Sequence, residues 1–253
     1  MSARPPDPDF ILSSGFLAFG RQAGFLAGTI DVGIHPHKVF GTSSGALVGA
    51  MFCAGMSITA ILEEVQARRP ISWMGLSLTP WRGVFHLAPM IARLHAVLPE
   101  RFEDLDIPLA VGVQRADGGF AFVDSGPLPP VVAASCAMPW VFQPVKIELD
   151  GGLEACADGG AADRLGISAW RGLPDRAATA IVHLVERTAG AQVQVELGDL
   201  TVVRSGRSGA HFWNLGGVDD RARETRRSTH TVLSEAAGSN GDESSRNPTT
   251  PPL

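Results

Sequence analysis

The chain contains no tyrosine, only three cysteines and no long apolar run, and each shortage argues against a class of protein. Without tyrosine, no tyrosine side chain can act as a nucleophile, acid or base. The scattered cysteines Cys53, Cys136 and Cys156 form no Cys-x-x-Cys pair, so we expect neither a metal site nor a disulfide framework. A reducing compartment is the simpler interpretation.

Targeting signals and a basic charge excess are also missing. The longest apolar run, around Ala46–Met56, is shorter than the ~18 residues of a membrane-spanning helix. Residues 1–9 lack the basic and then apolar order of a signal peptide, so we expect a cytoplasmic protein. Lys and Arg number 21 against 26 Asp and Glu, which argues against a nucleic-acid partner. The sequence leaves the oligomeric state open.

What the chain does contain is a large apolar fraction and many glycines. Hydrophobic residues make up 45% of the 253 residues and glycine accounts for 29, so we expect a sizeable core with many close backbone approaches. Residues 1–8 are predicted to be a flexible leader and residues 9–234 a single domain. Residues 235–253, rich in Ser, Asn, Thr and Pro, are predicted to be a disordered polar tail.

Short apolar segments alternate with helical patterns in the first part of the chain. Strands are predicted at Phe10–Leu12 and Lys38–Gly41, and helices at Phe19–Ile30, Ser44–Met56 and Ile58–Arg68. A strand, helix, strand, helix order is typical of parallel strands joined by crossover helices. The predicted fold class is therefore α/β, a three-layer α/β/α fold around a mainly parallel sheet.

The sharpest motif is Gly41-Thr42-Ser43-Ser44-Gly45, which follows an apolar strand and precedes a small-residue helix. This context matches a nucleophile elbow, in which glycines permit a sharp turn and the serine hydroxyl projects at a helix N-terminus. Free amides there stabilise negative charge, as an oxyanion requires. The alternative is a tight strand-to-helix turn in which Ser43 caps the helix.

A nucleophilic serine needs a base, and none of the seven histidines lies in a suggestive motif. The second signal is Asp158-Gly159-Gly160, which follows a short apolar segment. The same tripeptide occurs at residues 117–119 and 150–152, so a plain turn remains an alternative on the tripeptide alone.

Three motifs in this order resemble the patatin-like phospholipase family. They are the segment Gly41–Ala46 before a buried helix, Ala134-Ser135-Cys136-Ala137-Met138-Pro139, and the downstream Asp-Gly-Gly at residues 158–160. The resemblance extends from about Phe10 to about Trp170. It implies a Ser–Asp dyad without histidine, in which Ser43 is the nucleophile and Asp158 its base. It also implies a lipid or fatty-acyl ester substrate, an acyl-enzyme, transient contact with a membrane surface and no cofactor.

The chain departs from this family in its glycine-rich loop. Residues 13–20 read Ser-Ser-Gly-Phe-Leu-Ala-Phe-Gly, so only Gly15 clearly remains, and the usual basic residue is replaced by Ala18. The amides of Gly15, Phe16 and Ser44 are the expected oxyanion hole. Because losing one donor costs roughly 10²–10³ in rate, an alternative is a weak or inactive relative that binds lipid or a partner.

Two further alternatives remain open. An ordinary α/β-hydrolase would need His183 or His211 within reach of Ser43. Residues 70–87 form an apolar loop with several tryptophan and phenylalanine side chains, which either covers a site or completes the core. No Gly-x-Gly-x-x-Gly or Gly-Lys-Ser/Thr loop is present, so a nucleotide cofactor is not expected.

Overall fold

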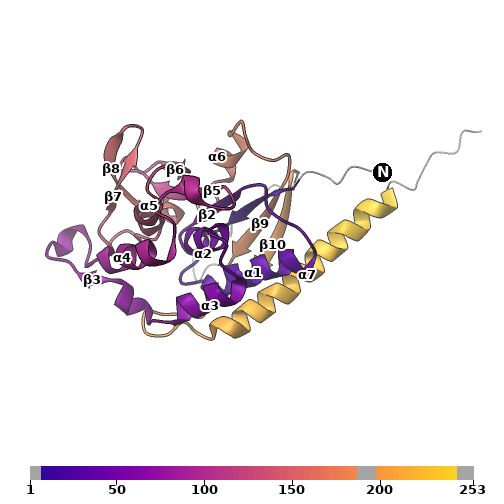
Figure 1. Cartoon of the computed structure of the whole chain (residues 1–253), viewed down its shortest axis with the longest axis horizontal. Helices are drawn as coiled ribbons and strands as arrows, with labels where there is room; N and C mark the ends of the chain where they lie inside the picture. Colours follow the sequence, from indigo (N-terminus) through magenta and orange to yellow (C-terminus); the bar gives the residue numbers. More distant parts are fainter. Residues whose placement is uncertain (1–6, 187–197, 244–253) are drawn as a thin grey trace, which may run out of the picture.

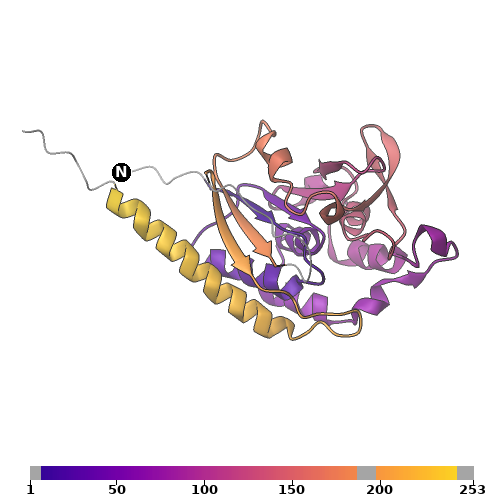
Figure 2. The ribbon, with the colours of Figure 1, turned by 180° about the vertical axis from the view of Figure 1, so that it is seen from behind.

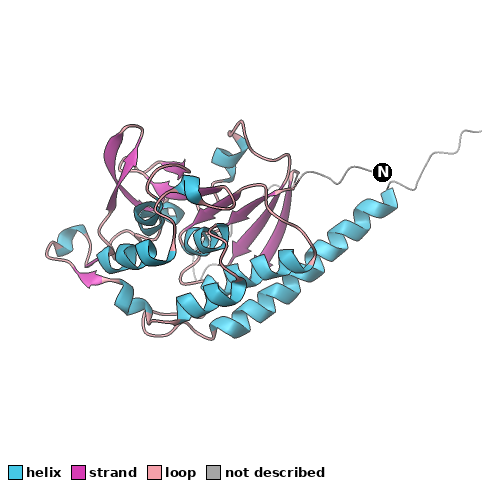
Figure 3. Ribbon diagram, in the orientation of Figure 1, coloured by secondary structure: helices cyan, strands magenta, loops and turns pink. Residues whose placement is uncertain are grey.

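The computed structural model describes residues 7–186 and 198–243, and it shows helices packed on a central sheet (Figure 1, Figure 3). The strands are β1 Asp9–Leu12, β2 Val39–Thr42, β3 Gly75–Leu76, β4 Phe85–His86, β5 Leu109–Gln114, β6 Phe120–Val123, β7 Val145–Leu149, β8 Gly152–Asp158, β9 Ala180–Val185 and β10 Leu200–Ser205. The helices are α1 Phe19–Asp31, α2 Ser44–Cys53, α3 Ile58–Gln66, α4 Ala88–Val97, α5 Leu128–Ser135, α6 Ile167–Arg171 and α7 Val218–Glu243. Short 3₁₀ turns are η1 Pro70–Trp73, η2 Pro80–Arg82, η3 Phe102–Asp104 and η4 Gly159–Ala161.

The central sheet is mainly parallel, as the alternating pattern predicts. Its strand order is β10-β9-β1-β2-β5-β8-β7, and β6 also pairs with β5. Strands β10, β9, β1, β2 and β5 run parallel, whereas β6 and β8 pair with β5 in antiparallel fashion, and β7 pairs with β8 in the same way. The carboxyl ends of β1 and β2 therefore meet at one edge of the sheet.

Both faces of β1, β2, β5 and β9 are buried, which explains their apolar runs, whereas β10 contains the exposed Arg204. In β1, Phe10 and Leu12 belong to the large core, whereas Ile11 belongs to a smaller core on the other face. The large core contains side chains of α1, α2, α4 and α5, and the smaller core contains Trp170 of α6. The two helical layers of the predicted fold are present, and the one that holds α6 is thin.

Helix α7 lies along α1 and extends beyond the boundary predicted for the tail (Figure 2). It continues to Glu243, so the prediction of a disordered tail from residue 235 is wrong for residues 235–243. Glu235 and the two alanines that follow favour helix, and they extend a helix already fixed by packing. Residues 1–6 of the predicted leader (residues 1–8) and residues 244–253 of the predicted tail lie outside the described residues. Among the described helices, none is long and apolar enough to cross a membrane.

Three glycines spaced by four along α1 permit its close packing on α7. A Cβ atom on Gly20 or Gly24 would lie 2.3 Å from the carbonyl oxygen of Val218 or Ala222. Gly28 continues the stripe against Thr229. Part of the glycine excess is therefore required by helix packing rather than by turns.

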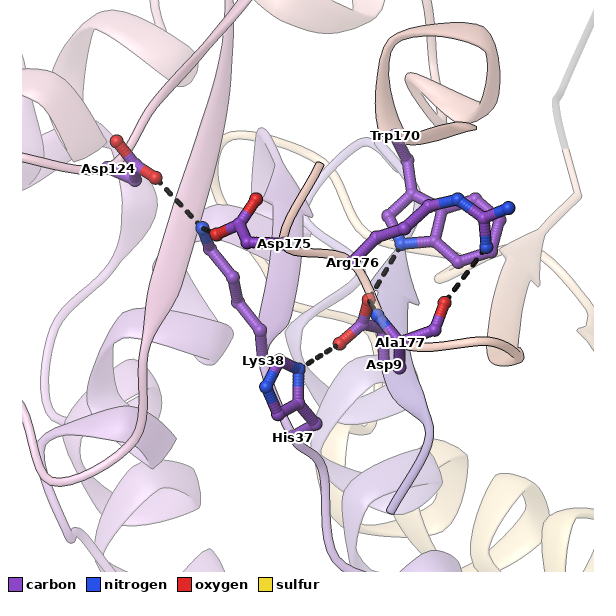
Figure 4. A network of polar contacts seen from close by, with 8 residues as sticks. All are labelled: Asp9, His37, Lys38, Asp124, Trp170, Asp175, Arg176 and Ala177. Carbon is purple, nitrogen blue, oxygen red and sulfur yellow. Dashed lines mark hydrogen bonds and ion pairs between the residues drawn. The ribbon is translucent and has the colours of Figure 1, made fainter. Parts of the chain in front are cut away.

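At the amino ends of β1 and β2, charged side chains form a network of hydrogen bonds and ion pairs (Figure 4). Fully buried Asp9 accepts hydrogen bonds from Trp170 Nε1 (2.8 Å) and the Ala177 amide (2.8 Å), and it contacts His37 Nδ1 (3.0 Å). Lys38 is paired with Asp124 and Asp175. These bonds satisfy the buried polar groups and tie α6 and the segment after it to the sheet.

Candidate active site

The turn between β2 and α2 holds Ser43 in a strained backbone conformation. Its φ of 55° and ψ of −118° lie in a region that residues with side chains rarely adopt. Glycines on both sides allow the surrounding backbone to approach. A Cβ atom would lie 2.7 Å from the Gly45 carbonyl oxygen at Gly41, and 2.4 Å from the Leu12 carbonyl oxygen at Gly45. This is the geometry of a nucleophile elbow.

The structure brings Ser43 and Asp158 into direct contact. Ser43 Oγ donates to Asp158 Oδ2 at 2.7 Å, although the two residues are far apart in the sequence. Asp158 ends β8 and is buried, and its Oδ1 accepts from the Gly160 amide at 2.7 Å. At Gly159 a Cβ atom would lie 2.4 Å from the Gly112 carbonyl oxygen of β5, so glycine is needed where the chain leaves β8.

Ser135 supports the elbow, and sequence analysis assigned it no role. The Ser43 amide donates to Ser135 Oγ at 2.9 Å, and Ser135 Oγ donates to the Gly112 carbonyl at 2.6 Å. Ser135 therefore links the strained turn to β5 through the end of α5. The signal that could have found it is its place in the Ala-Ser-x-Ala-x-Pro segment.

The three predicted oxyanion-hole amides lie at the same pocket as Ser43. Gly15, Phe16 and Ser44 all line it, and among the described residues none of their amides donates to a protein acceptor. The buried Ser44 hydroxyl also lacks a hydrogen-bond partner among the residues that the structure describes. Groups without a partner that line a pocket are available to a bound molecule.

The departure in the glycine-rich loop is accompanied by a buried arginine that the sequence did not single out. Arg164 Nη2 donates to the carbonyl oxygens of Ser14 (2.8 Å) and Val185 (2.6 Å), and the Ser14 amide donates back to the Arg164 carbonyl (2.9 Å). Ser208 Oγ donates to the Phe16 carbonyl at 2.7 Å. The loop backbone is thus held from two sides.

Arg21 does not substitute for the basic residue that the family usually has at the position of Ala18. Its guanidinium turns toward α7, where it donates to Thr225 Oγ1 (3.2 Å) and is paired with Glu224 (2.9 Å). It therefore joins α1 to α7, and its Nη2 also donates to the carbonyl of Arg207 (3.4 Å), which lines the pocket.

The pocket has a volume of about 760 Å³ and a mostly apolar wall. This volume is within the range of small-molecule sites, and the wall suits a hydrocarbon chain. Ser43 and Asp158 lie at it together with side chains from both ends of the apolar loop of residues 70–87, Trp73, Met74 and Leu87. Residues 70–87 are not structureless, because they contain η1, η2 and the small antiparallel pair of β3 and β4.

The histidines that a Ser–Asp–His triad would require are engaged elsewhere. Fully buried His183 contacts Gln22 Oε1 (2.7 Å) and Ser205 Oγ (2.9 Å) through its two ring nitrogens. Burial, followed by the nearby charge of Arg21, lowers the pKa of His183 to about 3, so the ring is neutral. His211 Nδ1 accepts from the Trp213 amide within its own turn.

The cysteine near the site is a protonated thiol. Cys136 Sγ donates to the Ser43 carbonyl at 3.4 Å, and burial, together with the charge of Asp158, raises the pKa of this thiol well above its ordinary range. It stabilises the turn and is no nucleophile. Within the described ranges, no group of three or more His, Cys, Asp or Glu side chains could hold a metal ion.

Comparison with solved structures shows the fold. VipD from Legionella pneumophila superposes with a TM-score of 0.57 at 12% identity, over 91% of this chain and 67% of that one. Full-length ExoU from the type III secretion system of Pseudomonas aeruginosa, solved in complex with full-length SpcU, gives 0.56 at 11% identity, over 92% and 53%. The chain thus spans two thirds of the first and about half of the second. No curated protein matches it.

An α/β fold with a serine at a strand-to-helix elbow is typical of serine hydrolases, a class that includes lipases and phospholipases. Within that class, the sequence model described as patatin-like phospholipase matches residues 10–169. The chain belongs to the patatin-like phospholipase family.

Proposed function

We propose that the chain is a serine acyl hydrolase of lipid or fatty-acyl esters, with Ser43 as nucleophile and Asp158 as base. The observation that carries this proposal is the 2.7 Å hydrogen bond from Ser43 Oγ to Asp158 Oδ2 at the wall of an apolar pocket. Family membership supports the substrate class. The strained backbone of Ser43 is what a rigidly presented nucleophile requires.

In the first half of the reaction, Ser43 Oγ attacks the ester carbonyl carbon while Asp158 Oδ2 takes the hydroxyl proton. The carbonyl oxygen becomes an oxyanion, which the amides of Gly15, Phe16 and Ser44 stabilise. When the intermediate collapses, the bond to the alcohol breaks and the alcohol leaves with the proton from Asp158. An acyl group then remains on Ser43.

In the second half, water attacks the acyl carbon and gives its proton to Asp158. The tetrahedral intermediate forms in the same place and collapses to free acid, and Ser43 Oγ regains the proton. The Gly160 amide keeps Oδ1 occupied throughout, so Oδ2 alone faces the serine. One carboxylate can therefore serve as base and acid in turn without a histidine.

Covalent labelling with a fluorophosphonate probe tests this function. The wild type should label, Ser43→Ala should not, and Asp158→Asn should label far more slowly because the base is lost. Ser44→Ala is the matched control, because it removes the neighbouring hydroxyl but keeps the amide, so it should still label.

Labelling that survives in Ser43→Ala would show that the nucleophile is misassigned. A folded wild type that does not label would instead favour the alternative of a weak or inactive family member that binds lipid or a partner. Hydrolysis of short-chain and long-chain p-nitrophenyl esters would then measure whether the pocket prefers a fatty-acyl chain.

A further inference from the structure

The most exposed apolar side chains of the described residues gather beside the pocket. The segment that we call the flap, residues 75–86, consists of β3, η2 and β4 and lies at the end of the molecule opposite the C-terminal end of α7 (Figure 1). Its side chains Leu76, Leu78 and Trp81 are 77%, 96% and 78% exposed. Apolar side chains so fully exposed are normally removed from water by a partner.

The flap is joined to the pocket at both of its ends. Trp73 and Met74 before it and Leu87 after it line the pocket. The Phe85 amide donates to the Val141 carbonyl at 2.9 Å, which ties β4 to the segment after α5. A surface that the flap contacts would therefore lie next to the pocket.

Trp140 adds an aromatic side chain to the same surface. It follows Pro139 of the pocket wall, is 90% exposed and has a φ of 70°, which a residue with a bulky side chain rarely adopts. Phe142 of the same segment is buried in the pocket wall, so this backbone turns one aromatic ring inward and the other outward. Tryptophan suits the boundary between water and lipid, because its ring is both apolar and polar.

The sequence of the flap and its flanking segments carries charge of one sign. Residues 65–99 contain four arginines and no aspartate or glutamate, although the whole chain has a net charge of −5. Arg68, Arg69 and Arg82 are exposed, and among the described residues only Arg93 of the four is paired with a carboxylate, that of Glu64. A cationic and apolar surface is complementary to an anionic lipid bilayer.

Three of the four arginines of α7 lack this property because acidic side chains neutralise them. Arg226 is paired with Asp31, Arg223 with Asp220 and Arg221 with Glu224. The helix richest in arginine is therefore not the cationic surface of the molecule.

We propose that the flap, with Trp140, Arg68 and Arg69, docks the chain on a bilayer that contains anionic phospholipids. The surface places the pocket against the bilayer, from which a lipid can enter. This inference rests on the proposed hydrolase function for its purpose, but it can fail independently of it.

Flotation on vesicles tests the docking in the Ser43→Ala protein, which cannot consume the lipid. Vesicles of phosphatidylcholine alone are compared with a mixture of phosphatidylcholine and phosphatidylserine. Binding should favour the anionic mixture and weaken as salt is raised. Leu78→Ser and Trp81→Ser should each weaken it about tenfold, and Arg82→Glu about fivefold or more.

Matched controls lie at the other end of the molecule. Ile30→Ser removes an exposed apolar side chain of α1, and Arg227→Glu reverses an exposed charge on α7; both should bind like the parent protein. Circular dichroism establishes that each variant is folded.

Equal loss of binding in flap and control variants would overturn the proposal. Absence of flotation with either lipid would also overturn it and would leave the exposed side chains to a protein partner. Fluorophosphonate labelling separates the two ideas. A wild type that labels, beside a Ser43→Ala protein that does not float, refutes docking alone. Flotation without labelling refutes the hydrolase alone.

Discussion

Polar groups at the amino ends of β1 and β2 have hydrogen-bond partners, whereas two amides at the carboxyl ends have no acceptor among the described residues. At the amino ends, Asp9 accepts bonds from two buried donors, and Lys38 has two carboxylate partners (Figure 4). At the carboxyl ends, Ser43 is strained, and the amides of Gly15 and Ser44 donate to no acceptor in the described part of the chain.

The amino ends of β1 and β2 therefore stabilise the folded state, and the carboxyl ends hold the groups of the proposed binding site. Satisfied groups lower the free energy of the folded state, whereas groups without a partner and a strained backbone raise it. The second arrangement persists because the elements around it are fixed by their cores. The following predictions separate the two ends, in order of decreasing effect.

Removing the Ser43 hydroxyl should affect activity and leave stability nearly unchanged. Ser43→Ala is expected to lower turnover of a soluble ester by about 10⁴-fold or more, because the nucleophile is lost. Its free energy of unfolding in urea should change by less than about 1 kcal/mol. Unchanged turnover, or a large loss of stability, would contradict the assignment of this end of the sheet to function.

Removing the Asp9 carboxylate should lower stability and leave activity nearly unchanged. Asp9→Ala leaves Trp170 Nε1 and the Ala177 amide without their acceptor, so the free energy of unfolding should fall by about 3 kcal/mol. Activity per folded molecule should stay near that of the wild type. Asp9→Asn is the conservative control and should lose less, because one acceptor oxygen remains.

Arg164 acts on the site through the loop that it holds. Arg164→Ala removes the bonds to the Ser14 and Val185 carbonyls, and a shifted Gly15 amide should lower kcat by about 10²-fold with KM little changed. A role in stability alone would leave kcat unchanged. Arg164→Lys, which keeps the charge but not the forked geometry, should fall between the two.

Acid should destabilise the fold through His183. Its pKa is about 3 in the folded protein, against about 6.5 in an unfolded chain. Between these values the unfolded state binds the extra proton, so stability is full above pH 6.5 and falls toward pH 3. The slope contributed by this group is about 1.4 kcal/mol per pH unit. Urea unfolding across this window measures it. His35→Gln, an exposed control, should keep the slope, and His183→Gln should reduce it.

Relieving the strain at the elbow should give the smallest effect. Ser43→Gly is expected to be more stable than Ser43→Ala by about 1 kcal/mol, because glycine adopts the φ of 55° without cost. Ser44→Gly is the control in the first turn of α2 and should be less stable than wild type. If the Ser43→Gly and Ser44→Gly substitutions shift the urea midpoint in the same direction, strain at Ser43 does not explain the change in stability.

Much of the parallel sheet follows from local patterns. The predicted strand over Phe10–Leu12 is confirmed, because an apolar strand bounded by glycine and polar turns gives a clear signal. The end of α7 was misplaced. Ser, Asn and Gly are poor helix formers, but a helix anchored by packing on α1 continues through them.

The site was only partly readable. Ser43 lies in a local motif, and the family resemblance distinguished Asp158 from the two other Asp-Gly-Gly segments; the two side chains are in contact. Ser135 and Arg164 act through carbonyl groups of segments distant in sequence, and no pattern of residue types encodes such bonds. The sequence of residues 70–87 shows that this loop is apolar, but it does not show which of its side chains are exposed.

The strand and helix order and the glycine-flanked serine follow from the sequence, because these features depend on neighbours along the chain, whereas the choice of Asp158 as the proposed partner of this serine follows from the family resemblance. The folded structure was needed to show that Arg164 binds the Ser14 and Val185 carbonyls, that Arg21 joins α1 to α7, and that three of the four arginines of α7 are paired with carboxylates. It also decided that apolar and cationic side chains share the surface beside the pocket. Contacts between distant segments form only when the cores bring them together, and a long buried or exposed side chain takes its role from whatever it then meets.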